Sequence, residues 1–525
     1  MSRRVLDLAA MAVATAVLLN GDDLTIDDVW SVAVGRTPAA LSDDGRSKMA
    51  AARELVDRAA SESSGEHTYG INTGFGRFVS KAIPSELSEE LQLRLLRSHA
   101  CGVGEPYPDE VVRAAMVLRA NALAKGFSGA RIETVELLLD CLNKGVLPVV
   151  PSRGSVGASG DLAPLAHLAL PLVGEGSARF EDELLSGADA LARAALEPVR
   201  LQAKEGLSLV NGTQFMGAVG SLGLVRAGRI AKTADIACAL SVEALQGSRV
   251  SFMPEIQALR PLAGQAAAAA NLIRLLEASA IIEAHRWCDK VQDAYSLRCA
   301  PQVHGASRDL LAYVEQTVSV EVNAATDNPL VFVDRGELVS NGNFHGQPVA
   351  LALDCMALAV AELASISERR VERLVNPSLS DGLPAFLTHD GGLNSGFMIP
   401  QYVAAALVSE NKVLCHPASV DSIPTSAGQE DHVSMGNAAG LKCWTVLGNV
   451  ERALAIELLA AAQGVEFLAP LEPGTGARAA HDFVRSLSPT VMEDRTLGPD
   501  IERVAEAIRA GELVAAVEAE VGELA

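Results

Sequence analysis

Long segments that are apolar on nearly every face dominate the chain from Gly212 to Ala469. Glycines, prolines and polar clusters separate these segments, and each segment is far longer than a strand. A helix that is apolar all round is buried at the centre of a bundle or between subunits. The pattern therefore predicts a long helix bundle, with helices over 212–246, 262–289, 303–320, 346–374, 396–416 and 434–467.

The first part of the chain shows shorter, amphipathic patterns. Thr25 precedes Asp27 and Asp28, which is typical of an N-cap followed by an acidic first helical turn, and a strand or turn near Val17 comes before it. Spaced leucines predict another helix that ends at Gly102. That helix covers 87–101, and others are predicted over 47–61, 108–125 and 132–143, with a polar insert over 175–196 and a short hairpin-like break at 331–339.

Composition and charge narrow the class of protein. Alanine and leucine dominate and aromatic residues make up only 4%, which favours helix, and 525 residues are long for a single core. The net charge of −22 argues against nucleic acid or an anionic membrane as a partner. An anionic substrate would therefore need a local arginine to bind, because the negative net charge of the protein repels it.

The cysteines and the N-terminal segment indicate the cellular compartment of the protein. Eight cysteines show no Cys-x-x-Cys or metal-ligand spacing, which predicts buried free thiols in a reducing cytosol and no metal site. Arg3 and Arg4 precede an apolar stretch from Ala9 to Leu19 that could pass for a signal peptide, but Asp7 interrupts it and no clear processing site precedes Asp22. We expect a short helical extension on a cytoplasmic protein, with no segment of about 18 uncharged apolar residues that would span a membrane.

One stretch of small residues, from Gly154 to Leu165, reads Gly-Ser-Val-Gly-Ala-Ser-Gly-Asp-Leu-Ala-Pro-Leu. Because glycine has no Cβ, Ala158, Ser159 and Gly160 permit a turn tight enough for an amide nitrogen to reach a carbonyl carbon. If the nitrogen of Gly160 attacks the carbonyl of Ala158 and two waters leave, the second with the Ser159 hydroxyl, a methylidene-imidazolone ring forms. Such a ring is a strong electrophile, which ordinary side chains do not supply.

Three ordinary interpretations of this stretch compete with the ring. A nucleophile elbow needs a glycine where Asp161 stands, and a phosphate-binding loop needs spacings that are absent. The tripeptide Ala-Ser-Gly by itself is common in plain loops. The apolar segment Leu162–Val173 that follows at once makes the longer run more distinctive.

Polar residues at helix ends and breaks are further candidates, since sites in helical scaffolds gather there. Tyr69 lies in a glycine-rich loop, and a phenol must have its pKa lowered to act as a base near neutral pH. His99 also suits a C-terminal cap, and Asn211 an N-cap for the next helix. Arg298, in a break between apolar helices, fits either a structural ion pair or a clamp for a carboxylate. Glu430 stands among amide and imidazole neighbours just before a helix.

Together these segments resemble the family of histidine and aromatic amino-acid ammonia-lyases over residues 17–525. The resemblance rests on seven motifs in order: Tyr-Gly-Ile-Asn-Thr-Gly-Phe-Gly from Tyr69, Ser-His-Ala from Ser98, Ala-Ser-Gly-Asp-Leu-Ala-Pro-Leu from Ala158, Asn-Gly-Thr from Asn211, Gln-Asp-x-Tyr-Ser-x-Arg from Gln292, Gly-Asn-Phe-His-Gly from Gly342 and Gln-Glu-Asp-His-Val-Ser-Met from Gln429. The Gly-Ser-Ser-x-Met-Pro loop of the fumarase-type lyases is missing.

The resemblance implies a mainly α fold, with a long central helix bundle of the fumarase/aspartase-like superfamily architecture. We predict an N-terminal extension at 1–16, a mixed N-terminal domain that carries the ring at 17–210, the central bundle at 211–470 and a C-terminal helical region at 471–525. The resemblance also implies a homotetramer whose sites each combine several chains.

The same resemblance assigns chemical roles to matching positions. Ala158, Ser159 and Gly160 would form the ring, 4-methylidene-imidazol-5-one (MIO), with no external cofactor and no metal. Tyr69 and Tyr295 would be the acid–base pair, one of which removes a β-proton.

Substrate binding would fall on seven further positions. Arg298 would be the clamp for the substrate's carboxylate, and Asn211 would steady the substrate and polarise the ring. Gln292 and Phe344 would lie near the ring. The substrate's side chain would be surrounded by His99, Glu430 and Met398. An imidazole has an N–H donor and a ring acceptor, which a carboxylate and a histidine can satisfy together. A phenyl group would leave Glu430 buried without a partner.

The expected activity is therefore the deamination of L-histidine to trans-urocanate and ammonia. A tyrosine or phenylalanine ammonia-lyase, or an aromatic 2,3-aminomutase, stays open as an alternative because aminomutases can share the Gln-Glu-Asp-His run. Two positions depart from the family pattern: the family often has asparagine where this chain has Gly428, and glycine where it has Asn341. Both departures concern the geometry of the local loops.

Overall fold

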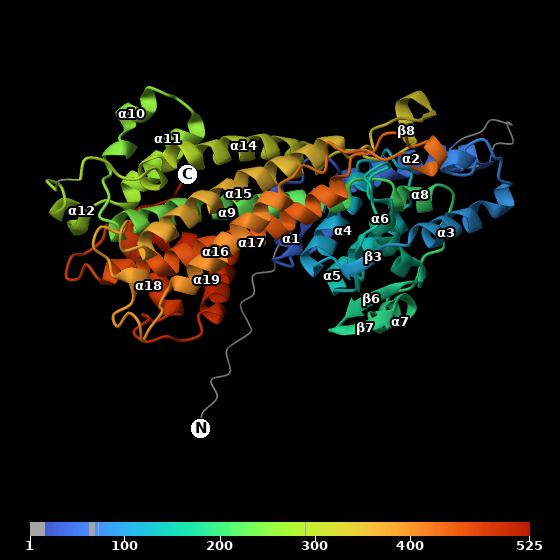
Figure 1. Ribbon diagram of the computed structural model, residues 1–525. Helices are drawn as coiled ribbons and strands as arrows, with labels where there is room; N and C mark the ends of the chain where they lie inside the picture. The colour runs from blue at the N-terminus through green and yellow to red at the C-terminus, as the bar shows by residue number, and fades with distance from the viewer. Residues whose placement is uncertain (1–15, 62–68, 72, 289) are drawn as a thin grey trace. The chain divides into compact units, whose positions relative to one another are not determined.

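The computed structural model describes residues 16–61, 69–71, 73–288 and 290–525, and these residues form a mainly helical protein with four small sheets (Figure 1). The predicted mainly α fold class is confirmed. The predicted N-terminal extension falls on residues 1–15, which lie outside the described residues, and on Ala16. The chain divides into two compact units, of which the first comprises Met1–Leu222, Gln316–Ala352 and Ala418–Leu441 and the second the remainder.

The first unit contains all nine strands of the described residues and eight helices of its own. Its strands are β1 (Val17–Leu19), β2 (Ala39–Leu41), β3 (Val103–Pro106), β4 (Leu147–Pro148), β5 (Pro151–Arg153), β6 (Ser177–Phe180), β7 (Glu183–Ser186), β8 (Leu330–Phe332) and β9 (Glu337–Val339). Its helices are α1 (Ile26–Ala33), α2 (Asp43–Ser61), α3 (Ser88–His99), α4 (Asp109–Ala124), α5 (Ile132–Lys144), α6 (Leu162–Ala169), α7 (Gly187–Arg193) and α8 (Glu205–Val210).

Helix α1 begins as its sequence predicts. Thr25 is the N-cap: its hydroxyl oxygen accepts from the Asp28 backbone N–H at 3.0 Å, and the Asp28 carboxylate accepts from the Thr25 N–H at 3.0 Å. This reciprocal capping box satisfies two backbone donors that a helix start leaves unpaired. The strand before the helix, β1, pairs in parallel with β2, with Val17 opposite Ala39.

Helix α4 forms the centre of the first unit, and every residue from Val111 to Ala124 is buried. Its buried charges are matched by backbone carbonyls: the Arg113 guanidinium donates to the oxygens of Val32, Ala33 and Leu142. Those carbonyls belong to the last turns of α1 and α5, where helix carbonyls have few partners within their own helix. One arginine therefore joins three helices in the core.

The small sheets lie at the connections of the first unit. The predicted polar insert folds as the antiparallel pair β6–β7 followed by α7, and β4 joins the same sheet. The predicted break at 331–339 is the β8–β9 hairpin, whose register pairs Leu330 with Val339.

The regular elements among the described residues of the second unit are all helices. Its own helices are α10 (Pro254–Ala258), α11 (Ala263–Leu275), α12 (Ala280–Ala284), α13 (Tyr295–Arg298), α16 (Met398–Leu414), α18 (Thr475–Leu487), α19 (Gly498–Ala510) and α20 (Glu512–Val521). Four long helices contribute residues to both units: α9 (Gln214–Ala244), α14 (Ala300–Glu321), α15 (Gln347–Val375) and α17 (Gly436–Glu466). Five of the six predicted long helices match α9 and α14 to α17 within a few residues.

The sixth prediction, one helix over 262–289, is wrong. Helix α11 ends at Leu275, and Ala278 adopts a left-handed backbone with φ of 61°. Ser279 then starts α12 by accepting from the Ile282 N–H at 2.9 Å, while its hydroxyl donates to the buried carboxylate of Glu243 at 2.7 Å. A distant partner on α9 thus stabilises a break that the apolar pattern does not show.

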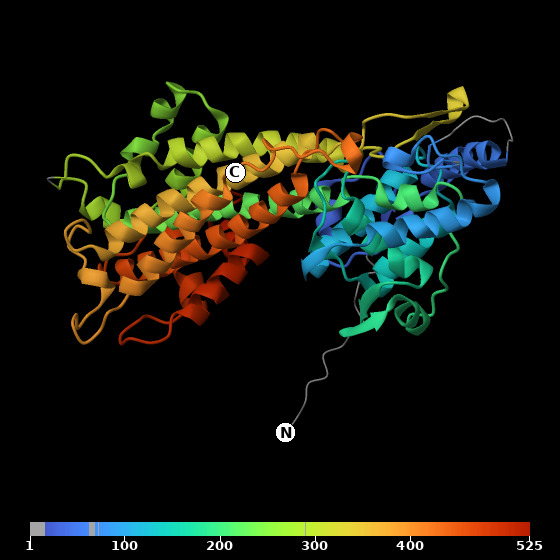
Figure 2. The same ribbon diagram turned by 45° about the vertical axis from the view of Figure 1, so that its right-hand side comes forward.

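Paired charges join the long helices inside the second unit. Arg226 on α9 donates twice to the Glu451 carboxylate on α17, at 2.8 and 2.9 Å, and both side chains are almost fully buried. Arg370 on α15 likewise pairs with Glu457 on α17, and Ser241 on α9 donates to the same carboxylate at 2.7 Å. In both views the second-unit parts of α9, α15 and α17 run side by side (Figures 1 and 2). Buried charges are tolerated there because each has a partner.

Helix α15 is both apolar and largely buried. Among the described residues it alone has the length and composition to cross one, but 67% of its apolar window is buried inside the protein, as expected of a core helix. All eight cysteines are free, and Cys141, Cys238 and Cys443 are buried. Cys101 and Cys288 are exposed, so the prediction of buried thiols is wrong for these two, which lie just beyond helix ends.

Candidate functional site

The small-residue turn is held by hydrogen bonds from distant parts of the first unit. The Ser155 hydroxyl accepts from the Gly157 N–H at 3.1 Å within the turn. The Ser434 hydroxyl donates to the Gly157 carbonyl at 3.1 Å, and the Met435 N–H donates to the Val156 carbonyl at 2.9 Å. The segment that follows Glu430 in sequence therefore clamps the turn from outside.

Glycine is required at position 160 for two reasons. Gly160 has φ of 75°, which side chains rarely adopt, and it forms a parallel bridge with Gly212. A Cβ at Gly160 would lie 2.0 Å from the Gly212 carbonyl oxygen, and the neighbouring Asp161 N–H donates to that same oxygen at 2.7 Å. Ala158, Ser159 and Gly160 therefore form a tight turn, with Ala158 only 6% exposed.

Asp161 ties this turn to the start of α9. Its fully buried carboxylate accepts from the Met216 N–H at 2.9 Å and from the Ser155 hydroxyl at 3.2 Å. Burial raises the pKa of Asp161 to about 7, against the pull of these hydrogen bonds.

A cavity of about 400 Å³ opens beside the turn in the first unit. Five predicted site residues line it together: Tyr69, His99, Ser159, Asn211 and Glu430. Its other lining residues are Phe75, Gly76, Arg77, Phe78, Leu95, Leu162, Leu207, Val210, Asn328, Ser426 and Ala427. The cavity thus brings together positions that lie up to several hundred residues apart in the sequence.

His99, the last residue of α3, presents a hydrogen-bond acceptor to this cavity. Its Nδ1 lies 3.0 Å from the Leu95 carbonyl oxygen and 3.0 Å from the Ser98 hydroxyl, which itself donates to Leu95. Both neighbours of Nδ1 are therefore acceptors, so Nδ1 carries the proton and Nε2 keeps its lone pair. Burial lowers the pKa of His99, although Glu430 opposes the shift, which favours this neutral form.

Glu430 lies on a short hairpin-like turn with Thr425. The two residues form an antiparallel bridge, and the Thr425 hydroxyl donates to Glu430 Oε2 at 2.6 Å. One carboxylate oxygen is thereby occupied, while the other stays available to a ligand. With His99 Nε2, the cavity offers two acceptors, which differs from the expectation that His99 would donate to the ring acceptor of an imidazole.

Tyr69 lies against Phe75 in an edge-to-face arrangement, with ring centroids 6.0 Å apart. Burial raises the pKa of Tyr69, and the negative charges of Glu430 and Asp327 add to the shift, although a hydrogen bond from Gly76 opposes it. This direction is opposite to the one that a base needs. In this environment Tyr69 holds its phenolic proton at neutral pH.

Asn211 ends α8 and is not the N-cap of α9, which begins at Gln214. The alternative interpretation of Asn211 as that N-cap is therefore wrong. Its backbone carbonyl accepts from Arg119 Nη1 at 2.7 Å, and its N–H donates to the Leu207 carbonyl at 3.0 Å. Its side chain lines the cavity, with Nδ2 bonded to Asp327 and Asn328 and Oδ1 without a hydrogen-bond partner among the described residues.

The remaining predicted residues do not line this cavity. Phe344, in the loop between β9 and α15, belongs to the first unit but is not part of the lining. Gln292, Tyr295, Arg298 and Met398 all belong to the second unit. The Arg298 guanidinium lies 4.6 Å from the Tyr295 ring centroid and donates to the Asp293 carbonyl at 3.0 Å, and the Tyr295 side chain is 71% exposed.

Some cavity residues escaped sequence reasoning. Ser426 and Ala427 line the wall in left-handed conformations, with φ of 51° and 53°, and such strain is typical of functional sites. Neither residue type signals that conformation in a sequence. Arg77 is an exposed lining residue, and its position in a plain glycine-rich run carried no signal.

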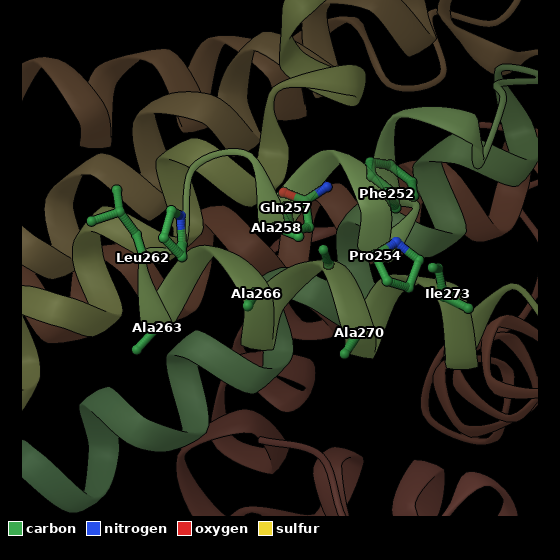
Figure 3. A pocket seen from close by; sticks show the side chains of 11 residues that line it. Phe252, Pro254, Gln257, Ala258, Leu262, Ala263, Ala266, Ala270 and Ile273 are labelled. Carbon is green, nitrogen blue, oxygen red and sulfur yellow. The ribbon is translucent and has the colours of Figure 1, made fainter.

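Another cavity, of about 300 Å³ in the second unit, lacks reactive groups (Figure 3). Its walls are apolar apart from Gln257, whose amide donates to the Ser251 and Met253 carbonyls and accepts from Gln265. Alanine and leucine residues such as Ala266 and Leu262 form much of the rest. The cavity beside Ser159 is thus the better candidate for chemistry.

Comparison with known proteins identifies one family. The family described as aromatic amino acid lyase matches residues 24–486. The histidine ammonia-lyase of Gloeobacter violaceus is 56% identical over 508 residues, which cover 97% of this chain and 98% of that protein. The crystal structure of histidine ammonia-lyase from Trypanosoma cruzi aligns with a TM-score of 0.89 at 46% identity, covering 97% of this chain and 96% of that one. Tyrosine aminomutase from Streptomyces globisporus aligns with a TM-score of 0.92 at 38% identity, covering 97% of this chain and 100% of that one.

Proposed function

This chain belongs to the aromatic amino acid lyase family, and on that premise we propose that it is a carbon–nitrogen lyase that converts L-histidine to trans-urocanate and ammonia. The observation that carries the choice of histidine is the pair of acceptors, His99 Nε2 and the Glu430 carboxylate, in the cavity that also holds Ser159. A neutral imidazole ring brings one N–H donor to such acceptors and a protonated one brings two, whereas a phenyl ring brings none and would leave both unpaired.

The turn at 158–160 fits the MIO group that the family implies. Gly160 adopts the conformation and the close approach to Gly212 that only glycine permits, and Ser159 faces the cavity. No external cofactor is needed, because the group would be made from Ala158, Ser159 and Gly160. When formed, it supplies an electrophile for the substrate's amine.

The side chains of the cavity then bind, orient and move protons. Glu430 and His99 hold the imidazole, and Thr425 fixes one oxygen of Glu430 so that the other faces the ligand. Tyr69 holds a proton at Oη before substrate binds, and the ammonium group of an amino acid would lower its pKa by adding a positive charge nearby. Tyr69 and Tyr295 are our candidates for removing the β-proton and returning a proton.

We assign the rest of the site to other copies of the chain in a homotetramer. Arg298 is the proposed clamp for the substrate's carboxylate, Gln292 and Phe344 the neighbours of the ring and Met398 a wall of the side-chain pocket. The exposure of Gln292 and of the Tyr295 ring supports this arrangement, since both side chains are open to a second chain. A planar guanidinium binds a carboxylate with two parallel hydrogen bonds.

The proposed setting is the cytoplasm, with a small amino acid as the partner and no nucleic acid or membrane. Free cysteines throughout the chain and the net charge of −22 support it.

A direct assay separates this function from its rival. Urocanate is conjugated, so ultraviolet absorbance should rise when the purified enzyme receives L-histidine and stay flat with L-tyrosine. The second candidate, an aromatic 2,3-aminomutase, is favoured by the likeness to tyrosine aminomutase. Formation of β-tyrosine, without urocanate from histidine, would establish that rival and refute our proposal.

A further inference from the structure

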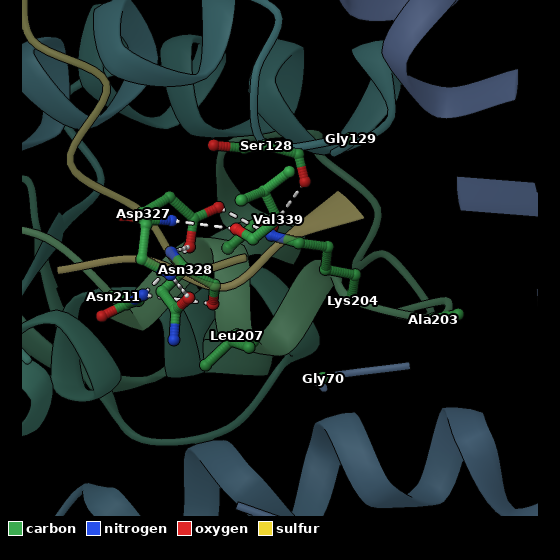
Figure 4. Close-up of polar contacts among 12 residues, drawn as sticks. Gly70, Ser128, Gly129, Ala203, Lys204, Leu207, Asn211, Asp327, Asn328 and Val339 are labelled. Atoms are coloured by element: carbon green, nitrogen blue, oxygen red, sulfur yellow. Dashed lines mark hydrogen bonds and ion pairs between the residues drawn. The ribbon is translucent and has the colours of Figure 1, made fainter. Parts of the chain in front are cut away.

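A buried ion pair lies behind Asn211 in the first unit, and the proposed chemistry does not use it (Figure 4). Lys204 Nζ lies 2.7 Å from Asp327 Oδ2, and the two side chains are 0% and 1% exposed. The ammonium also donates to the Ser208 hydroxyl at 3.2 Å. Asp327 precedes Asn328, a lining residue of the cavity.

The second oxygen of Asp327 faces the Asn211 amide. Asp327 Oδ1 accepts from Asn211 Nδ2 at 3.1 Å and from the Asn328 N–H at 2.7 Å. Asn211 Nδ2 also donates to the Asn328 carbonyl oxygen at 3.3 Å. The Asn211 amide nitrogen, which carries two hydrogens, thus has two acceptors in the Asp327–Asn328 segment (Figure 4).

This arrangement permits only one orientation of the amide. An ionised carboxylate accepts hydrogen bonds and cannot donate them, so a flipped Asn211 would place its Oδ1 against two acceptors. The observed orientation turns Oδ1 away from Asp327, where that atom is buried and has no hydrogen-bond partner among the described residues. Because Asn211 is 2% exposed and lines the cavity, this orphan acceptor is available to a ligand donor.

The same geometry changes the role implied by family resemblance. To polarise the ring, Asn211 would have to donate from Nδ2, but both of its hydrogens are committed to Asp327 and Asn328. What remains is an acceptor. The substrate's amine is the donor that an amino acid brings next to the reactive turn.

We propose that Asp327, held by its ion pair with Lys204, is a positioning residue that locks the Asn211 amide so that Oδ1 accepts a hydrogen bond from the substrate's α-amine. The inference rests on the proposed function, because it needs an amino-acid substrate. Lys204 contributes by holding Asp327 Oδ2 at 2.7 Å, which leaves Oδ1 to face the Asn211 amide.

The test compares two ligands that differ only in the amine. Full-length Ser159→Ala enzyme, which cannot form the ring, serves as the parent, and calorimetry measures its binding of L-histidine and of 3-(imidazol-4-yl)propionate, which lacks the amine. The double variant Lys204→Met/Asp327→Asn removes one positive and one negative charge together, so the net buried charge around Arg119 stays the same. We expect it to weaken L-histidine binding about tenfold to hundredfold, the range for a hydrogen bond to a charged group. Binding of the propionate should change less than about twofold, since that ligand never used the bond.

A second variant keeps the proposal testable if the double variant folds poorly. Asn211→Ala removes the acceptor itself and should show the same ligand-selective loss, and adding it to the double variant should cause no further loss. The control is Arg226→Met/Glu451→Gln, which removes a comparably buried ion pair from the second unit and should weaken neither ligand.

The outcomes separate the two proposals. Equal losses for both ligands, or unchanged histidine binding in Asn211→Ala, would overturn the role of Asp327 even if the unmodified enzyme deaminates histidine. If the unmodified enzyme does not deaminate histidine and the parent binds neither ligand, both proposals fall.

Discussion

Replacing Glu430 by glutamine tests how the cavity selects its substrate. Thr425 already occupies Glu430 Oε2 at 2.6 Å, so a ligand N–H has one carboxylate oxygen available. A hydrogen bond to a charged group contributes about 1.5–3 kcal/mol and a neutral one about 0.5–1.5 kcal/mol. Glutamine keeps the shape of the side chain and loses its charge. The hydrogen bond to the imidazole should therefore weaken by about 1–1.5 kcal/mol, which lowers kcat/KM for histidine about five- to twelvefold.

The assay needs a ligand that makes no such bond. L-Phenylalanine has no ring N–H, so its inhibition constant as a competitor should stay the same or improve in Glu430→Gln, because an unpaired charge no longer opposes its ring. Glu337→Gln, at an exposed position of β9, is the matched control and should leave both values unchanged. The reasoning is refuted if kcat/KM for histidine is unaltered, or if phenylalanine binding weakens by the same factor.

Three other perturbations probe the remaining parts of the site. Ser159→Ala should abolish activity, and its intact mass should lack the loss of two waters that the unmodified enzyme should show; normal turnover would contradict the role of the turn. Arg298→Lys keeps the charge but loses the planar fork, so KM for histidine should rise about tenfold or more, whereas an unchanged KM would eliminate the clamp. Because burial lowers the pKa of His99 below 6.5, the acceptor at Nε2 persists at neutral pH and disappears as pH falls through that lowered pKa. The KM for histidine should therefore rise at acidic pH more steeply in the natural enzyme than in His99→Gln, and parallel pH profiles would count against this role.

The sequence predicted helices well where the local pattern of apolar residues or of capping residues determines the helix. The segment over 212–246 is apolar all round, and α9 runs from Gln214 to Ala244 in the buried core. Thr25 and Asp28 form the capping box that their spacing indicates. The break at Ala278 was missed because Glu243, a partner on another helix, holds Ser279.

Prediction of the site relied on resemblance more than on physical reasoning. Motif positions led to Tyr69, His99, Ser159, Asn211 and Glu430, which one cavity brings together.

The contacts that tune those residues could not be read from the sequence. Lys204 and Asp327 pair across 123 positions, and the Thr-Asp-Asn-Pro segment around Asp327 signals only a turn. The upward shift of the Tyr69 pKa likewise follows from burial and from Glu430, which only the fold brings near.

The clamp on the reactive turn also orders events during synthesis of the chain. Gly157 and Val156 are held by Ser434 and Met435, and the hydrogen bond between Ser434 and Gly157 spans 277 positions. A ribosome-bound chain that ends before Ser434 has made every atom of Ala158, Ser159 and Gly160 but cannot yet hold them in this turn. Under the proposed function, formation of the ring therefore waits for the last fifth of translation, and chains truncated before Ser434 should keep an ordinary serine at position 159.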